Sequence, residues 1–311
     1  MSTEALIEFF ERLVADGVAS VGELDRERLS AIGISVDGDT ARLDSSTELL
    51  DEKRILSLLD EDAKAWLASI TIKAATGSTN SDLVQSEAPS INGRVILAET
   101  QLLGRGRRGR TWMSPFARNI ALTLGCGVQR SGQELGGLSL VVGYAVLRAL
   151  EALGVNDLAL KWPNDILYQG RKLCGVLIEM DHSRRSPEAV IGIGINHSGA
   201  ELVRAQVDQG LAELVESKNP PTRNETAAAM ISGVRKQVDR FNAHGFEAFR
   251  PEWDARHYFS GRQVRVAGAG KAMIGRVLGV SPFGELHLST PHGQEFLSGG
   301  EISMRDLHAH D

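Results

Sequence analysis

The feature that most limits the fold is a run of short apolar segments in the middle of the chain, each separated from the next by a tight turn. The segment 158–162 ends at Pro163, and a turn at Gly170 leads into the apolar runs 172–179 and 189–195. Tight turns join antiparallel strands, whereas parallel strands need a crossover of a dozen or more residues. The spacing therefore predicts an antiparallel sheet rather than a doubly wound parallel one.

Periodicity elsewhere in the chain completes an α+β pattern. We expect helices over residues 4–15, 21–31, 51–68, 136–153, 224–241 and 246–257, and further strands over residues 69–75, 94–98 and 119–128. The helix over 136–153 is rich in small and apolar residues, as expected of a helix that packs on a sheet. No uninterrupted apolar run reaches the roughly 18 residues that a membrane span needs, so no membrane association is expected.

Changes in the pattern of predicted helices and strands divide the chain into three predicted domains. Residues 1–64 hold two short helices and a hairpin around an Asp-Gly turn, the outline of a small winged-helix-like domain. Residues 65–260 carry the sheet and its helices, and residues 261–311 hold short strands with Gly turns, typical of a small β-barrel.

The N-terminal domain is acidic, which argues against DNA binding. Residues 1–60 contain fourteen Asp and Glu side chains against six Lys and Arg. Affinity for DNA depends on basic side chains that neutralise phosphates. There is also too little chain between the second helix and the hairpin for a basic recognition helix. We therefore expect a degenerate winged helix.

A loop rich in glycine and arginine, residues 104–112, predicts an anion site. Its three glycines allow close backbone approach to a ligand, and its four arginines offer planar donors to phosphate or carboxylate. The glycine spacing matches a dinucleotide fingerprint, but Pro115 argues against the helix that must follow it. No Gly-Lys-Ser/Thr ends the loop, so it is not a P-loop. A solvated basic turn is the alternative, yet the chain as a whole carries formal charge −6, so clustered arginines need a local reason.

Further polar residues stand at the ends of predicted strands. Ser78, Thr79 and Asn80 begin a helix, where N-capping is the alternative to ligand binding. The stretch 161–165 and Lys172 surround turns, where surface polarity is the alternative.

Six segments in order along residues 70–305 resemble the signature of biotin protein ligases. They are Ser78-Thr79-Asn80, Gln101 with the loop Gly104 to Arg110, Lys161-Trp162-Pro163-Asn164-Asp165, Arg171-Lys172-Leu173 with Gly175, Gly192-Ile193-Gly194-Ile195-Asn196 and Ser298-Gly299-Gly300-Glu301-Ile302-Ser303. The resemblance implies a catalytic domain like that of class II aminoacyl-tRNA synthetases and a C-terminal SH3-like barrel. It also implies that biotin and ATP form biotinyl-5′-AMP, whose acyl group passes to a lysine of the biotin carboxyl carrier domain of a carboxylase.

The resemblance also assigns roles to residues, position by position. Side chains implied for biotin are Ser78, Thr79, Asn80, Gln101, Arg105, Arg107 and Lys172, with the backbone amide of Gly106. Residues implied for ATP and the adenylate are Arg107, Arg110, Trp112, Asn164 and Asn196. Those implied for catalysis are Arg107, Lys161, Lys172 and Asp165, the last as a hypothetical base or orienting group for the acceptor amine. Mg²⁺ is expected to bridge phosphate oxygens through water, with no metal site built from protein side chains.

The chemistry of such a reaction agrees with the residues present. A carboxylate and a phosphate about 4 Å apart repel by roughly 4 kcal/mol at an effective dielectric near 20, so nearby cations are required. Because an acyl-adenylate hydrolyses in water, we also expect residues 103–113 to be mobile without ligand and to close over the site.

Alternative functions remain open from the sequence. One is a biotin-responsive transcriptional regulator that uses the site only to sense ligand, and another is a lipoate or octanoyl ligase, whose loop differs. A scaffold protein is disfavoured by the clustered cations. A homodimer fits the family, although no patch is identified. The first residues lack a signal-peptide pattern, so we expect a cytoplasmic protein in which Cys126 and Cys174 are buried thiols.

Overall fold

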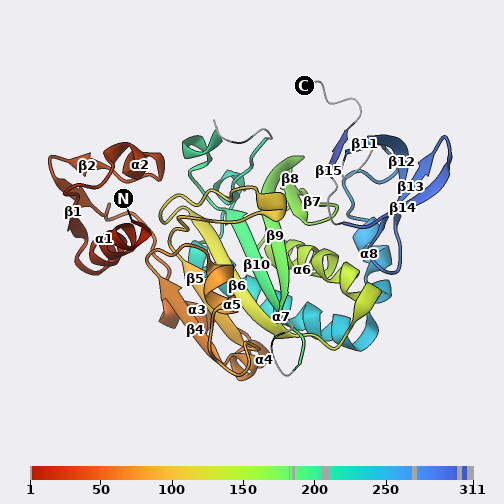
Figure 1. The fold of residues 1–311 in the computed structure, drawn as a ribbon, viewed down its shortest axis with the longest axis horizontal. Coiled ribbons are helices and arrows are strands. Elements are labelled where there is room, and N and C mark those ends of the chain that lie inside the picture. Colours follow the sequence, from red (N-terminus) through yellow and green to blue (C-terminus); the bar gives the residue numbers. More distant parts are fainter. Residues whose placement is uncertain are drawn as a thin grey trace.

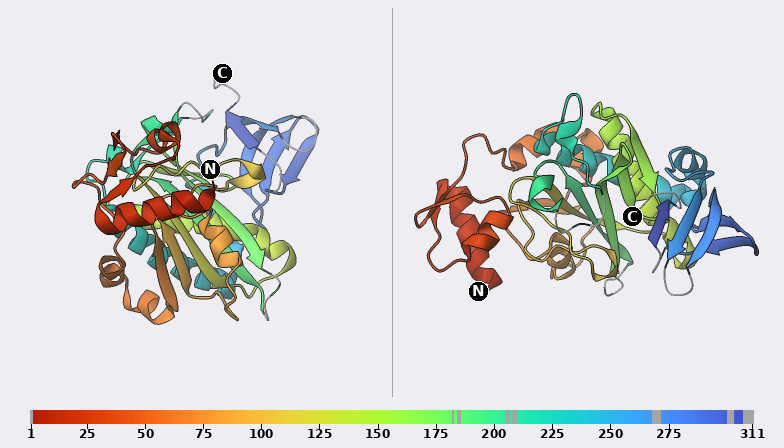
Figure 2. Two further views of the ribbon diagram at one scale, coloured as in Figure 1. Left: turned by 60° about the vertical axis from the view of Figure 1, so that its left-hand side comes forward. Right: turned by 90° about the horizontal axis from the view of Figure 1, so that it is seen from above.

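The computed structural model describes residues 2–181, 183, 186–204, 207, 210–267, 272–299 and 303–306. Figures 1 and 2 show a small N-terminal unit, a central sheet backed by helices, and a C-terminal sheet on the opposite side from the N-terminal unit.

The N-terminal unit packs a helix pair against a small sheet. Its elements are α1 (Thr3–Asp16), β1 (Val18–Ser20), α2 (Arg26–Ala31), β2 (Val36–Asp37) and β3 (Thr40–Arg42), with antiparallel strand order β1-β3-β2. Strand β1 was not expected from the sequence. Helix α2 is shorter than expected because Asp25, not residue 21, is its N-cap, and the Asp25 carboxylate accepts from the Arg28 amide.

The helix expected over 51–68 is two helices, α3 (Glu52–Leu58) and α4 (Glu61–Trp66). The expectation of one helix was wrong because Leu59 is extended and Asp60 begins a second helix, its carboxylate accepting from the Ala63 amide at 2.7 Å. Both helices pack on α7.

The central sheet has seven strands in the order β4-β5-β6-β10-β9-β8-β7. These are β4 (Ser69–Lys73), β5 (Arg94–Ala98), β6 (Asn119–Gly127), β7 (Leu158–Lys161), β8 (Asp165–Tyr168), β9 (Arg171–Asp181) and β10 (Glu188–Asn196). Only β4 and β5 pair in parallel, so the antiparallel α+β prediction is confirmed.

Helices α6 (Leu138–Ala152) and α7 (Arg223–His244) pack together behind the sheet, while the short α5 (Thr79–Val84) contacts β5, β6 and β10 (Figure 1). Helix α8 (Arg250–Asp254) leads to the C-terminal sheet, and the helix expected over 246–257 is thus split into a 3₁₀ turn and α8. The 3₁₀ turns in the described residues are Arg107–Gly109, Gly132–Gly137, Ala200–Leu202, Leu214–Glu216 and Phe246–Ala248.

In the described part of the chain, the stretch Gly132–Ala152 is long and apolar enough for a membrane span. Two-thirds of its apolar window is buried inside the protein, including Val141, Val142 and Val146 at zero exposure. This is the pattern of a core helix.

The C-terminal sheet is antiparallel, with strand order β14-β13-β12-β11-β15. Its strands are β11 (Gln263–Ala267), β12 (Met273–Val280), β13 (Leu286–Thr290), β14 (Gly293–Leu297) and β15 (Ser303–Asp306). The return of the chain near Ser303 is confirmed by the pairing of β15 with β11, whereas Gly300, Glu301 and Ile302 lie outside the described residues. The Trp162 indole donates to the Gly284 carbonyl at 3.0 Å and so joins this sheet to the central one.

Candidate active site

A cavity of about 560 Å³ lies on one side of the central sheet, over strands β9 and β10. All the residues to which the sequence assigned a ligand-binding or catalytic role line it: Ser78, Thr79, Asn80, Gln101, Arg105, Gly106, Arg107, Arg110, Trp112, Lys161, Asn164, Asp165, Lys172 and Asn196. Met304 of β15 also lines the cavity, so the C-terminal sheet reaches the site. The fold therefore brings together segments that are more than two hundred positions apart in the sequence.

One end of the cavity is a network of uncharged polar groups. The side-chain oxygen of Gln101 accepts from the backbone amide and from the hydroxyl of Thr79, at 2.9 and 3.1 Å. The Thr123 hydroxyl, which the sequence did not single out, lies 2.8 Å from the Thr79 hydroxyl oxygen and 2.7 Å from the Asn80 side-chain oxygen, and it can donate its one proton to either. Ser78 sits in the N-cap position of α5 but makes no capping bond with its side chain, so the N-capping interpretation does not explain its hydroxyl.

Asn80 depends on the absence of a side chain at Gly192. A Cβ placed on Gly192 would stand 2.3 Å from the Asn80 carbonyl oxygen, closer than atoms in contact can approach. Because side chains alternate along a strand, Gly192 and Gly194 face the same side of β10. The two glycines thus make the floor of the cavity.

Gly194 plays the same part for Trp112. A Cβ on Gly194 would lie 2.4 Å from Cε2 of the indole, and one on Gly175 would lie 3.3 Å from its Cζ3. The indole therefore lies against a part of the sheet that carries no side chains. The Lys172 Nζ atom lies 5.7 Å from the indole centroid, within the range of a cation–π contact.

The Gly-Arg loop folds as a hairpin of its own. The Gly106 amide donates to the Arg110 carbonyl at 2.7 Å, and the Trp112 amide donates to the Gly104 carbonyl at 2.9 Å. Arg108 takes φ of 61°, a left-handed conformation that is uncommon for a residue with a side chain.

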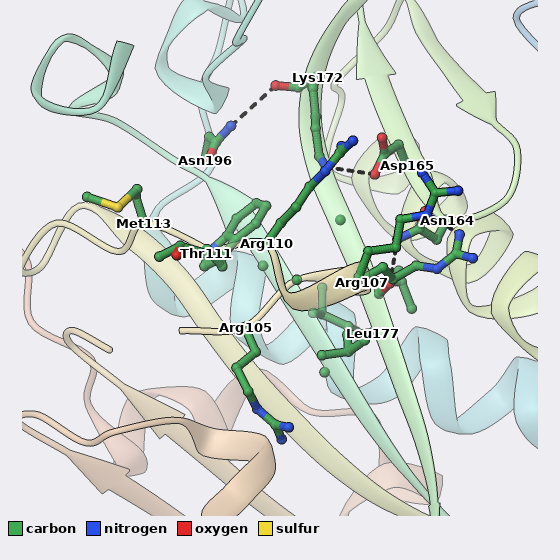
Figure 3. Close-up of a pocket in the computed structure, with 18 of the residues that line it drawn as sticks. Arg105, Arg107, Arg110, Thr111, Met113, Asn164, Asp165, Lys172, Leu177 and Asn196 are labelled. Carbon is green, nitrogen blue, oxygen red and sulfur yellow. Dashed lines mark hydrogen bonds and ion pairs between the residues drawn. The ribbon is translucent and has the colours of Figure 1, made fainter. Parts of the chain in front are cut away.

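Arg105 and Arg107 leave this hairpin in different directions (Figure 3). Arg107 donates to the Asn164 side-chain oxygen at 3.2 Å, and Asn164 in turn donates to the Val176 carbonyl. Burial lowers the pKa of the Arg107 guanidinium, the charge of Arg108 lowers it further, and Asp165 opposes both effects. An arginine drawn into a half-buried cavity in this way is placed to receive an anion.

Lys172 and Asp165 form an ion pair inside the cavity. The Lys172 Nζ and Asp165 Oδ1 atoms are 2.8 Å apart, and the side chains are 17% and 14% exposed. Lys161 stands opposite Asp165 in the backbone pairing of β7 with β8 and lines the same cavity. Asn196 donates to the Lys172 carbonyl at 3.2 Å, which ties β10 to the start of β9. These contacts disfavour the surface-polarity interpretation of this turn.

Sequence reasoning missed the charged groups that hold the site from outside. Glu179 on β9 accepts from Arg105 at 2.9 and 3.0 Å and from the Asn80 amide at 2.8 Å. Arg223 at the start of α7 pairs with Glu99 at 2.6 Å, and both side chains are 2% exposed. Glu99 lies two positions before Gln101, but no local motif marks either pair, because each joins segments far apart in the sequence.

Comparison with known proteins agrees with this geometry. Residues 72–196 match the model of the biotin/lipoate A/B protein ligase family, and residues 259–305 match the biotin protein ligase C-terminal domain. The bifunctional ligase/repressor BirA of Escherichia coli is 32% identical over 272 residues, which cover 87% of this chain and 83% of that protein. The chain belongs to the biotin protein ligase family.

Other members of the family span the same region. The biotin–[acetyl-CoA-carboxylase] ligase of Mycobacterium tuberculosis is 32% identical over 262 residues, which cover 81% of this chain and 95% of that protein. The structure of a biotin protein ligase from Aquifex aeolicus in complex with biotin and ATP has a TM-score of 0.68 at 26% identity and covers 77% of this chain and all of that one. The chain therefore shares its fold with a solved biotin protein ligase over a region much larger than the short motifs.

Proposed function

We propose that the protein activates biotin with ATP and transfers it to a lysine of a biotin carboxyl carrier domain. In the first step a biotin carboxylate oxygen bonds to the α-phosphorus of ATP, and the bond from that phosphorus to the pyrophosphate oxygen breaks. In the second step the lysine nitrogen bonds to the acyl carbon, AMP leaves with the electron pair of the broken C–O bond, and the nitrogen loses a proton. The observation that carries the proposal is the union of a neutral polar end and a cationic end in one cavity.

The neutral end is suited to the ureido head of biotin. Ser78, Thr79, Asn80 and Gln101 supply hydroxyl and amide groups that both donate and accept, and Arg105 stands beside them. The Gly106 backbone amide, Arg107 and Lys172 would meet the biotin carboxylate. In this arrangement the ring lies on the Gly192 floor and the carboxylate points toward the cations.

The cationic end is suited to the phosphate and the developing negative charge. Lys172 would offset charge at the reacting oxygens, with Lys161 and Arg107 beside it. Arg110, Asn164 and Asn196 would contact the nucleotide, and Trp112 would stack near the adenine or cover the adenylate. Arginine and lysine together oppose a repulsion of about 4 kcal/mol between the two anions.

Asp165 is proposed to orient or deprotonate the acceptor amine. The Asp165 carboxylate is paired with the Lys172 ammonium group in this structure. The proposed role therefore requires that Lys172 turn away from Asp165 and toward the phosphate when substrates bind. The same turn would make Lys172 available in the first step.

Mg²⁺ is proposed as a companion of ATP. Among the described residues no group of three His, Cys, Asp or Glu side chains gathers to hold an ion. The donor set of the cavity, one paired carboxylate with amide oxygens, fits an ion carried by phosphates and water rather than by a protein cage. Bound there, the ion would neutralise phosphate charge.

We retain the remaining expectations as proposals. The domains are residues 1–64, 65–260 and 261–311, the catalytic domain is like that of class II aminoacyl-tRNA synthetases, and the C-terminal one is an SH3-like barrel. The protein is proposed to act in the cytoplasm, and a homodimer is compatible with its fold.

The acidic N-terminal unit is proposed to lack repressor activity, although the Escherichia coli relative is named a ligase/repressor. Its helix α2 is six residues long, and the excess of acidic side chains repels phosphate. Tight binding of a biotin-operator duplex at physiological salt, measured by fluorescence anisotropy, would refute this part alone.

Purified protein incubated with ATP, biotin and an acceptor domain tests the main proposal. We expect pyrophosphate release that depends on biotin, followed by a mass increase on one acceptor lysine. Lipoate in place of biotin separates this activity from that of a lipoate ligase, and adenylate formation without transfer would indicate a ligand sensor.

A further inference from the structure

Glu179 is a carboxylate outside the cavity that holds two of the cavity's side chains at once. It lies on the same face of β9 as Gly175 and Leu177, which line the cavity, because residues two apart in a strand share a face. Its two oxygens accept from Arg105, and one of them also accepts from Asn80. One acidic group therefore joins the Gly-Arg loop to helix α5 across the open sheet face.

Both of its partners belong to the proposed biotin end. Asn80 is 4% exposed, and its amide nitrogen is held by Glu179, so its carbonyl oxygen is directed to Thr123 and the Gly192 floor. The negative charge of Glu179 fixes which end of the Asn80 side-chain amide faces it, because only the NH₂ group can donate. Without that charge the amide could rotate by half a turn, which would exchange the positions of its donor and its acceptor. The same loss would release the half-exposed Arg105 toward solvent.

The orientation of Arg105 supports this reading. Its guanidinium donates to Glu179. Figure 3 shows that Arg107 takes a different direction, toward the nucleotide-side residue Asn164, to which it donates. Arg105 thus holds the loop at the proposed biotin end of the cavity, and Arg107 holds it at the nucleotide end. Of these two arginines, it is Arg105 that donates to Glu179.

We propose that Glu179 is a positioning residue for biotin, which ties the Gly-Arg loop to helix α5 by holding Arg105 and Asn80 on one carboxylate. The inference rests on the proposed function, because it names the end of the cavity that biotin occupies. It predicts an effect on biotin that is separate from any effect on ATP.

The test is Glu179→Gln, which keeps the size of the side chain and removes its charge. We expect the KM for biotin in adenylate formation to rise about fivefold or more, with the KM for ATP within twofold of the parent and an unchanged melting temperature. Glu179→Asp, which keeps the charge, should lie between the parent and Glu179→Gln.

Glu252→Gln is the matched control. Glu252 also holds an arginine and a second donor from another helix, since it pairs with Arg240 at 3.0 Å and accepts from Tyr144, but it does not line the cavity. Its side chain is 48% exposed, comparable to the 31% of Glu179. This variant should leave both KM values unchanged.

A double-mutant cycle shows whether Glu179 acts through its arginine. If it does, Arg105→Gln combined with Glu179→Gln should raise the biotin KM no more than the larger single change. Additive effects, an unchanged biotin KM in Glu179→Gln, or an equal rise in both KM values would overturn the inference. Failure of the parent protein to form biotinyl-AMP would instead overturn the proposed function.

Discussion

Two glycines on one strand offer a way to separate the two ends of the cavity. Gly194→Ala places a Cβ 2.4 Å from Cε2 and 2.5 Å from Cζ2 of Trp112. Carbon atoms in contact normally stand about 3.5–4.0 Å apart, so the indole must move by roughly 1 Å. Gly194 is not among the glycines with positive φ, so alanine fits the backbone and the displaced indole is the expected cause of any effect.

The expected loss follows from that displacement. A misplacement of about 1 Å can slow a reaction on the order of a hundredfold. We take a loss of up to the same size for binding, so Gly194→Ala should weaken the affinity for a stable adenylate analogue by about ten- to a hundredfold. This corresponds to about 1.4–2.8 kcal/mol. Biotin alone should bind nearly as in the parent, because the neutral end of the cavity is untouched.

Gly192→Ala should give the opposite pattern. Its Cβ would stand 2.3 Å from the Asn80 side-chain oxygen, so we expect weaker binding of biotin and a nearly unchanged KM for ATP. Isothermal titration with biotin and with the analogue measures both. Gly127→Ala in β6, where a Cβ meets nothing closer than 3.7 Å, is the control for adding a methyl group to the sheet. If Gly192→Ala and Gly194→Ala had the same profile, the two-ended cavity would be the wrong interpretation.

Three further predictions address single side chains. Arg107→Gly should shorten retention of biotinyl-AMP by about a hundredfold, or roughly 2.8 kcal/mol, in a dissociation assay, because a half-buried cation is lost. Asp165→Asn should slow transfer from preformed adenylate in single-turnover experiments, and intact transfer would remove the proposed role. Burial lowers the pKa of His257 to about 3 in the folded state, so below pH 6.5 only the unfolded chain takes its proton. The free energy of unfolding should then fall by up to ~1.4 kcal/mol per pH unit between pH 6.5 and 3, and chemical denaturation of His257→Gln should show a shallower fall.

The mobility of residues 103–113 without ligand stays a prediction. The loop is held in the structure by its own hairpin bonds and by Arg105, Arg107 and Trp112, which reach Glu179, Asn164 and the glycine floor. Hydrogen exchange with and without biotin would measure it, and equal protection in both states would contradict loop closure.

The sequence by itself determined the antiparallel sheet, the Gly-Arg loop and many of the residues that line the cavity. Tight turns and alternating apolar positions are local signals, since backbone geometry over a few residues decides them. Short segments likewise contain the basic side chains that bind an anion and the hydroxyl and amide side chains that bind a polar head group. Local signals were less able to place helix ends, as Asp60 shows by starting a second helix within a continuous apolar pattern.

Only the tertiary structure decided which side chains work together. Glu179 joins Arg105 to Asn80, Arg223 meets Glu99 in the interior, and Gly194 makes room for Trp112. Each of these contacts joins segments distant in the chain. Its strength depends on burial and on distance, and both follow from the fold and not from the type of residue. The order of strands in the sheet creates those distances, and with them the division of the cavity into a neutral and a cationic end.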